Sequence, residues 1–179
     1  PYKMRVYSDD GQLRPINAMV GGHRGPGTLG VRNTGQMAFP MAANVMPDSG
    51  RRPAARAGRA ASRASSTTIQ GGALRTYRFD HYVESVQVRL ETQGRPLEAK
   101  IELLQGPNNV KKFIELQIED GHTRPFECVI ETPGSGNVVS VENTAPMEFP
   151  MTASVVPPSV AGDRSFGGGA DPYDPYIDP

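Results

Sequence analysis

The feature that most constrains this chain is a duplicated segment. Residues 1–47 align with residues 111–157 at a constant offset of 110 positions, without a gap. Within this alignment, residues 31–47 and 141–157 are identical at ten of seventeen positions, and both contain Asn-Thr-x-x-Met-x-Phe-Pro-Met. Turn dipeptides recur as well, with Asp10-Gly11 over Asp120-Gly121 and Arg14-Pro15 over Arg124-Pro125. A duplicated module predicts a pseudo-symmetric molecule, which suits oligomers and lattices better than a single active site.

The second copy reads as strands throughout. Apolar and polar residues alternate from Val86 to Glu91 and again from Leu97 to Leu103, the period of a strand with one buried face. Turn residues separate the runs, and Asp120-Gly121 predicts a two-residue hairpin. Six strands are expected, at residues 86–91, 97–103, 113–118, 126–132, 138–144 and 147–155. Short strands at intervals of about ten residues predict a sandwich or a barrel-like module.

These patterns predict an all-β fold of two pseudo-symmetric, antiparallel, sandwich-like modules. The first module covers residues 1–47 and the second covers residues 73–157, with a linker at 48–72 and an extended tail at 158–179. The first copy lacks the opening strand pair of the second. Either those residues precede Pro1 in a longer precursor, or another element fills their place.

Composition narrows the class of protein. Gly 20 and Pro 17 favour many turns over long helices, and a net charge of zero gives no overall field to recruit nucleic acid. No stretch approaches the roughly 20 apolar residues of a membrane span, so no membrane insertion is expected. The single cysteine, Cys128, lies in an apolar run and is interpreted as a small buried hydrophobe.

The chain lacks the patterns of the common catalytic and metal sites. His23, His81 and His122 share no ligand spacing, and Cys128 has no His or Cys two to four residues away. No Gly-x-Ser-x-Gly elbow occurs, and the glycine-rich stretches lack the lysine of a phosphate loop. We therefore predict no catalytic residue, no metal, no cofactor and no enzymatic activity.

Charged segments outside the repeat are candidates for contacts between copies. The linker carries Arg51, Arg52 and Arg56 with Arg59 and Arg63, whereas the tail carries Asp171, Tyr173, Asp174, Tyr176 and Ile177. A proline-fixed acidic tail with aromatic residues is a plausible docking peptide for a basic segment of a neighbour. The arginines have no interleaved aromatic residues for base stacking, so a solvated linker is preferred over a nucleic-acid contact.

The repeat also predicts equivalent cores. Phe39 aligns with Phe149 and Val45 with Val155, and each pair is expected to fill equivalent pockets of the two modules. These four residues are the predicted repeat core.

Residues 143–157, Asn-Thr-Ala-Pro-Met-Glu-Phe-Pro-Met-Thr-Ala-Ser-Val-Val-Pro, follow Arg-Pro-Phe-Glu-Cys-Val-Ile-Glu-Thr-Pro-Gly-Ser-Gly-Asn at 124–137. With their second copy, these segments resemble the pyrenoid shell proteins of diatoms and related algae. The resemblance implies a non-catalytic chloroplast protein at the pyrenoid periphery in the stroma, which self-assembles into a sheet around Rubisco and supports CO2 fixation. Its implied partners are other copies of itself, and Rubisco or other pyrenoid proteins.

The function predicted from these observations is that of a structural, self-assembling protein. The alternative is a non-catalytic binding module of a plastid protein, which captures a carbohydrate or a Rubisco surface through its loops. The absence of Trp weakens the carbohydrate reading, because sugar sites commonly use exposed aromatic rings.

Overall fold

The computed structural model describes residues 1–20, 27–36, 38–46, 66–106 and 109–157. These residues form ten strands and, within the described ranges, no helix. The strands are β1 (Tyr2–Ser8), β2 (Asn17–Met19), β3 (Thr67–Ile69), β4 (Leu74–Arg78), β5 (Ser85–Glu91), β6 (Leu97–Gln105), β7 (Val110–Ile118), β8 (Phe126–Glu131), β9 (Asn137–Asn143) and β10 (Met151–Val156). The prediction of an all-β fold is confirmed.

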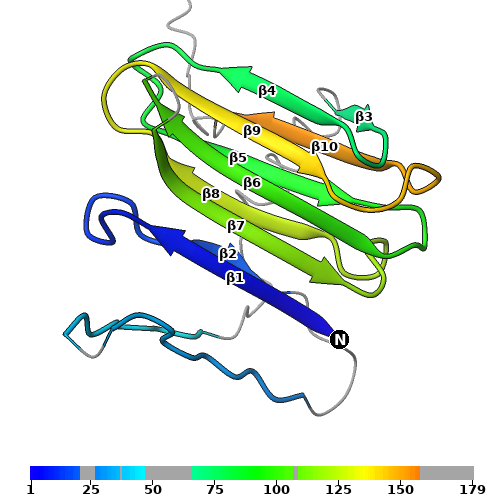
Figure 1. Ribbon diagram of the computed structural model, residues 1–179, viewed down its shortest axis with the longest axis horizontal. Coiled ribbons are helices and arrows are strands. Elements are labelled where there is room, and N and C mark those ends of the chain that lie inside the picture. The colour runs from blue at the N-terminus through cyan, green and yellow to red at the C-terminus, as the bar shows by residue number, and fades with distance from the viewer. Residues whose placement is uncertain (21–26, 37, 47–65, 107–108, 158–179) are drawn as a thin grey trace, which may run out of the picture.

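The strands make two five-stranded antiparallel sheets that lie face to face, as Figure 1 shows. One sheet has the order β1-β7-β6-β9-β4, and the other has the order β2-β8-β5-β10-β3. The two orders correspond strand for strand across the layers. The edges of the sandwich are therefore β1 with β2 on one side and β4 with β3 on the other.

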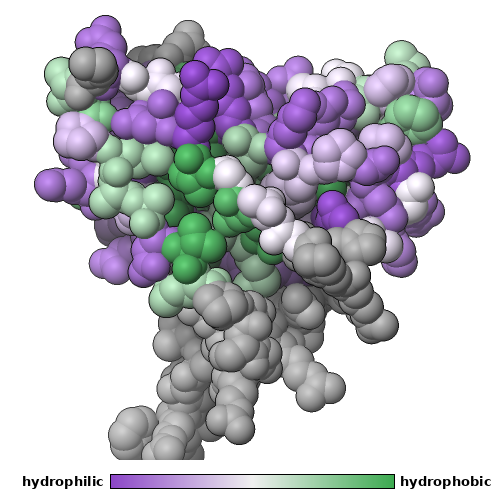
Figure 2. All heavy atoms as spheres, turned by 90° about the horizontal axis from the view of Figure 1, so that it is seen from below, coloured by the Kyte–Doolittle hydropathy of each residue, from purple (hydrophilic) through white to green (hydrophobic). Residues whose placement is uncertain are grey.

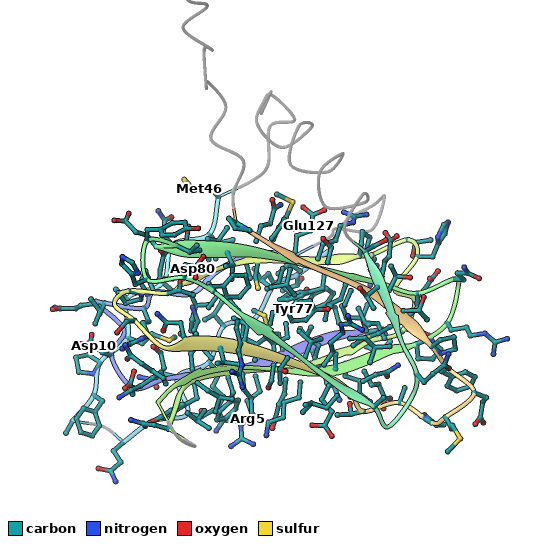
Figure 3. All side chains as sticks on the ribbon, turned by 90° about the horizontal axis from the view of Figure 1, so that it is seen from above. Arg5, Asp10, Met46, Tyr77, Asp80 and Glu127 are labelled. Carbon is teal, nitrogen blue, oxygen red and sulfur yellow. The ribbon has the colours of Figure 1, made fainter. Side chains whose placement is uncertain are left out.

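The core lies between the sheets and follows from the period-two pattern. Val86, Val88 and Leu90 of β5 are fully buried, and the alternating apolar residues of β6 and β7 face them from the other layer. Figure 3 shows side chains filling the space between the two layers. Each fully buried aliphatic side chain contributes about 1.5–3 kcal/mol relative to an exposed one. The central strands therefore carry most of the hydrophobic stabilisation.

Most connections cross between the sheets instead of forming hairpins. The prediction of a two-residue hairpin at Asp120-Gly121 is wrong, because β7 and β8 belong to different sheets. Gly121 does not have a positive φ. A Cβ at this position would lie 2.6 Å from Thr92 Oγ1 and 2.8 Å from Leu97 Cβ. The glycine is thus required by close packing against the β5–β6 connection.

Two predicted boundaries also differ from the structure. β3 lies inside the predicted linker and pairs with β10, where Met151 lies opposite Ile69. The predicted strand at 147–155 begins later, because residues 147–148 form a turn closed by the Phe149 amide donating to the Pro146 carbonyl. The second copy therefore extends its sandwich with a short strand that precedes residue 73.

The described residues of the first copy contribute two strands, β1 and β2. β1 extends one sheet beside β7, and β2 extends the other beside β8. Residues 27–36 and 38–46 form no strand, and Figure 1 shows them as an extended double trace beyond the β1–β2 edge. Two separate modules, one for each copy, therefore remain a prediction.

Candidate assembly interface

The junction between the two copies is built around pairs of equivalent residues. β1 pairs with β7 so that Arg5 lies opposite Glu115, its own equivalent at an offset of 110. In the other sheet, β2 pairs with β8 so that Ala18 lies opposite Cys128, again its own equivalent. Each of these two strand pairs therefore has a local two-fold axis at its pair of equivalent residues. The contact has the form of the isologous interface of a two-fold dimer, here made within one chain.

Polar contacts surround this axis at one end of the junction. Asp9 forms ion pairs with Arg14 Nη1 at 3.1 Å and with Lys111 Nζ at 3.0 Å. Arg14 is buried, and its Nη2 donates to Gln105 Oε1 at 3.0 Å. Burial raises the pKa of the Asp9 carboxyl, but the hydrogen bond from Lys111 and the charges of Arg14 and Lys111 outweigh it, so that the pKa is lowered. This network fixes the turn after β1 against the second copy.

Two equivalent residues with different chemistry lie inside the junction. Lys112 is 1% exposed, and its Nζ donates to the Pro15 carbonyl at 2.7 Å. Burial lowers the pKa of this amine. Its equivalent, Tyr2, has a buried hydroxyl with no hydrogen-bond partner among the described residues, and burial, helped by Cys128, raises the pKa of Tyr2 to about 12. The junction therefore contains polar groups that a purely hydrophobic contact would not need.

The turns of the first copy repeat the hydrogen bonds of the second. Asp10 Oδ1 accepts from the amides of Gln12 and Leu13, as Asp120 Oδ1 accepts from those of His122 and Thr123. Asn33 donates from Nδ2 to the Phe39 carbonyl at 2.9 Å, as Asn143 does to the Phe149 carbonyl at 2.9 Å. These local bonds require only the sequence that the two copies share.

Apolar side chains after β2 are exposed in the first copy, whereas several of their equivalents in the second copy are buried. We call residues 27–36 and 38–46 the apolar segment. Its large apolar side chains are at least half exposed, whereas Val139, Val141 and Met151 at the equivalent positions are at most 1% exposed. The exposed members are Leu29, Val31, Phe39, Met41, Val45 and Met46. Figure 2, which views the molecule from below, shows hydrophobic surface in the middle of this face with hydrophilic surface on both sides.

The four residues of the predicted repeat core differ in burial. Val155 is 7% exposed and belongs to the core, while Phe149 is half-buried beneath the Arg95 guanidinium, 5.2 Å from its ring centre. Phe39 is instead 66% exposed and Val45 is 59% exposed. These two residues differ from the prediction because no strands equivalent to β5 and β6 cover them among the described residues.

The predicted charged contacts lie outside the described residues. This applies to Arg51, Arg52 and Arg56 of the linker and to the tail residues Asp171, Tyr173, Asp174, Tyr176 and Ile177. Sequence reasoning missed Arg14, Lys112 and Tyr2. In the sequence, only the constant offset of 110 relates these residues to the junction, because β1 and β2 pair with β7 and β8, the equivalent strands of the second copy.

Within the described ranges, no cluster of three or more His, Cys, Asp or Glu side chains is arranged to hold a metal ion. Cys128 is buried, and burial raises the pKa of its thiol to about 12, which makes it a poor nucleophile. The described part of the chain also contains no helix long and apolar enough to cross a bilayer. The described residues also present open sheet edges and the exposed apolar segment.

Comparison with known families gives a match. A family model described as diatom pyrenoid shell protein matches residues 1–157, which covers both copies of the repeat and the linker between them. A search of curated proteins found no match.

Proposed function

The chain belongs to the diatom pyrenoid shell protein family, and from that premise we propose that its copies assemble into a sheet-like lattice around the chloroplast pyrenoid. In this role the protein lies in the stroma at the pyrenoid periphery, encloses Rubisco and supports CO2 fixation without catalysing a reaction. Its main partner is another copy of itself, and the inner face of the lattice lies against Rubisco or other pyrenoid proteins.

The observation that carries the proposal is the exposed apolar segment beside open sheet edges. Six large apolar side chains of this segment are between 50% and 74% exposed, which is unusual for a protein that remains a monomer. β1, β2, β3 and β4 are edge strands, and an open edge is a template for pairing with another chain. A net charge of zero adds no repulsion between copies.

Assembly is tested with the purified full chain at tens of micromolar protein. Light scattering and negative-stain microscopy should detect particles far larger than the 19.3 kDa monomer, in the form of sheets or tubes. Val31→Asp should reduce this assembly, because it places a charge among the exposed apolar side chains. Val31 is 55% exposed, so the variant should still fold.

Gln93→Asp is the matched control, since it adds the same charge to an exposed turn outside the apolar segment. It should assemble as the wild type does. A wild-type chain that stays monomeric in low and moderate salt would overturn the proposal. For the cellular role, a fluorescent fusion should form a rim around the Rubisco signal, and an even distribution through the stroma would contradict it.

A further inference from the structure

We propose that two chains pair through the solvent-facing side of the sheet β1-β7-β6-β9-β4, about a two-fold axis that runs parallel to the strands between β7 and β6. The charges on this face, and their order across the sheet, prescribe the arrangement. The inference rests on the proposed function, since it names one contact that chains make when they assemble. The contact lies on a sheet face and uses neither the sheet edges nor the apolar segment.

The outward side chains of four neighbouring strands form a row of alternating charge. Arg5 of β1 lies opposite Glu115 of β7, which lies opposite Lys100 of β6. Lys100 in turn lies opposite Glu142 of β9. We call these four residues the charge ladder. Figure 3 shows Arg5 on the opposite side of the sandwich from Glu127, so the ladder faces away from the other sheet.

The charge ladder is accessible although its members attract one another within the sheet. Arg5 Nη1 lies 3.7 Å from Glu115 Oε2, and these side chains are 73% and 44% exposed. Lys100 Nζ binds Glu102 Oε1 at 2.6 Å. This hydrogen bond, with the charges of Glu102, Glu142 and Glu115, raises the pKa of Lys100 against the opposing effect of burial. Exposed ion pairs within one sheet contribute little to stability, so the ladder can serve a contact between chains.

A two-fold axis between β7 and β6 places every charge of the ladder opposite a charge of the other sign. Arg5 then faces the partner's Glu142, and Glu115 faces the partner's Lys100. Each contact occurs twice, so the ladder makes four of them. An axis along β6 would place Lys100 against the partner's Lys100, and an axis along the ladder would place each charge against itself. Because like charges in contact are strongly unfavourable, the order of charges selects one arrangement.

The same arrangement joins a basic and an acidic half of the face. Lys3 and Arg5 lie along β1, and with Gln117 of β7 they border a shallow hollow of about 240 Å³. Glu98 and Glu142 lie on β6 and β9, and Glu98 is opposite Gln117. The two-fold axis brings the acidic half of one chain over the basic half of the other. The face is therefore complementary to itself.

An aromatic pair adds apolar area to this face. Tyr7 of β1 stacks on Phe113 of β7 with 5.4 Å between the ring centres, and Tyr7 is 48% exposed. The two rings lie one outward position along the strands from Arg5 and Glu115. Tyrosine is enriched at protein–protein interfaces, because its ring supplies contact area and its hydroxyl can bind a polar group. In the paired arrangement, β6 and β9 of the partner cover both rings.

The size of the face sets the strength of the contact. Four strands about 4.8 Å apart, each with about seven residues rising about 3.3 Å apiece, cover about 19 Å by 23 Å, so a pair buries about 900 Å² in total. A stable interface between two free chains buries about 1,200 Å² or more. Isolated chains should therefore pair weakly, whereas a sheet that presents many faces at once should hold its partner firmly.

Cross-linking between single-cysteine chains tests the geometry. The Thr144 amide donates to the Glu98 carbonyl at 3.0 Å, so residue 144 lies in the same row as Lys3 and faces the partner's residue 3 in the pair. Lys3→Cys and Thr144→Cys are prepared separately, and both leave the ladder intact. Two copies of residue 3, or of residue 144, lie on strands about 14 Å apart laterally. A short bismaleimide should link the two variants to each other at least about tenfold more than either to itself.

Ser135→Cys is the matched control for this experiment. Ser135 is exposed in the turn at the other end of β9, and a two-fold axis parallel to the strands keeps the two ends of the sandwich apart. Its mixture with Thr144→Cys should give no product. The native Cys128 is buried and does not react with the maleimide.

Reversal of the ladder separates contacts between chains from contacts within one sheet. The reversed chain carries Arg5→Glu, Glu115→Lys, Lys100→Glu and Glu142→Lys, with Glu102→Lys to retain the ion pair at residue 100. Alternation within the sheet is preserved, so the reversed chain should fold and cross-link with itself as the wild type does. A wild-type chain mixed with a reversed chain brings like charges together at all four contacts. The cross-link between residues 3 and 144 should then fall at least about tenfold.

Two results would overturn the proposal. One is a failure of Lys3→Cys and Thr144→Cys to cross-link under conditions where the wild type assembles. The other is equal cross-linking in the three mixtures, since the ladder would then act only within its own sheet.

Microscopy distinguishes this failure from a failure of the proposed function. Sheets one molecule thick that give no cross-link would overturn the paired face and leave assembly intact. Cross-linked pairs from chains that form no sheet, at high protein concentration, would support the paired face and contradict the lattice. Sheets two molecules thick, with the cross-link, are the expected result.

Discussion

The two Phe-Pro-Met motifs place the same side chain in opposite environments, which allows a matched mutational test. Met151 is 1% exposed and belongs to the hydrophobic core, whereas its equivalent Met41 is 50% exposed. Truncating a buried methionine to alanine costs about 2–5 kcal/mol, through lost burial and the remaining cavity. Surface substitutions usually change stability by no more than about 0.5 kcal/mol. We therefore expect Met151→Ala to destabilise the chain strongly and Met41→Ala to have little effect.

At this chain length, 1 kcal/mol corresponds to a shift in Tm of about 2–4 °C. Met151→Ala should accordingly lower Tm by about 4–20 °C, and Met41→Ala by about 2 °C at most. Both variants are compared with the wild type by circular dichroism during heating and in urea, at a few micromolar protein. Met151→Leu is the volume-conserving control and should cost less than about 1.5 kcal/mol.

Equal losses at the two positions would refute the reasoning, because Met41 would then have to be buried in solution. An unchanged Tm of Met151→Ala would also refute the reasoning, since the Met151 side chain would then lie outside the core. A smaller loss for Met151→Leu than for Met151→Ala is needed to attribute the effect to lost volume.

Three further predictions follow from the same structure. Gly121→Ala should cost about 1–3 kcal/mol by overpacking against Thr92 and Leu97, whereas Gly11→Ala should be neutral or stabilise the chain by up to about 1 kcal/mol. Urea unfolding measures both changes in stability, and equal costs would contradict the packing argument. Burial raises the pKa of the Cys128 thiol to about 12, so its contribution to the free energy of unfolding is complete below about pH 9 and is lost as pH rises towards 12. Urea unfolding at about pH 10.5 should therefore show a loss of about 2 kcal/mol in the wild type, and Cys128→Ala should abolish this loss. An unchanged dependence on pH in Cys128→Ala would assign the loss to another group. Hydrogen bonds from the His122 and Thr123 amides and the Thr123 hydroxyl lower the pKa of Asp120, so its contribution to stability is present above the ordinary carboxyl range and is lost as pH falls through the lowered pKa. Asp120→Ala should therefore destabilise the chain at pH 7 and have a smaller effect in acid, as measured by urea unfolding at both pH values. An equal loss at both pH values would argue against the carboxylate as the acceptor.

Part of this fold could be predicted from the sequence because hydrophobic alternation reports which face of a strand is buried. The alternating residues of β5 and β6 are buried in the predicted phase. Alternation does not report which sheet a strand joins. The turn at Asp120-Gly121 was therefore predicted as a hairpin, although it connects two layers.

Other features depend on contacts that no local pattern encodes. β3 is only three residues long, which is too short for a periodic signal, and it is held by pairing with β10. Phe39 and Phe149 share a motif but not an environment, because burial depends on the strands that cover them. The pairing of β1 with β7 and of β2 with β8 could not be predicted from the sequence either, since a repeat predicts that two copies have similar structures but not that they contact each other.

Because β1 pairs with β7 and β2 with β8, the two copies of the repeat must differ in sequence where they face each other. A residue on the axis of a perfectly symmetric pair meets a copy of itself, so Arg would face Arg and Glu would face Glu. Here Arg5 faces Glu115, with 3.7 Å between Arg5 Nη1 and Glu115 Oε2, and Ala18 faces the larger Cys128. The halves have become complementary by differing where symmetry would make them clash. Exchanging residues 1–20 for a second copy of 111–130 would place Glu against Glu and Cys against Cys, so the halves are related but no longer interchangeable.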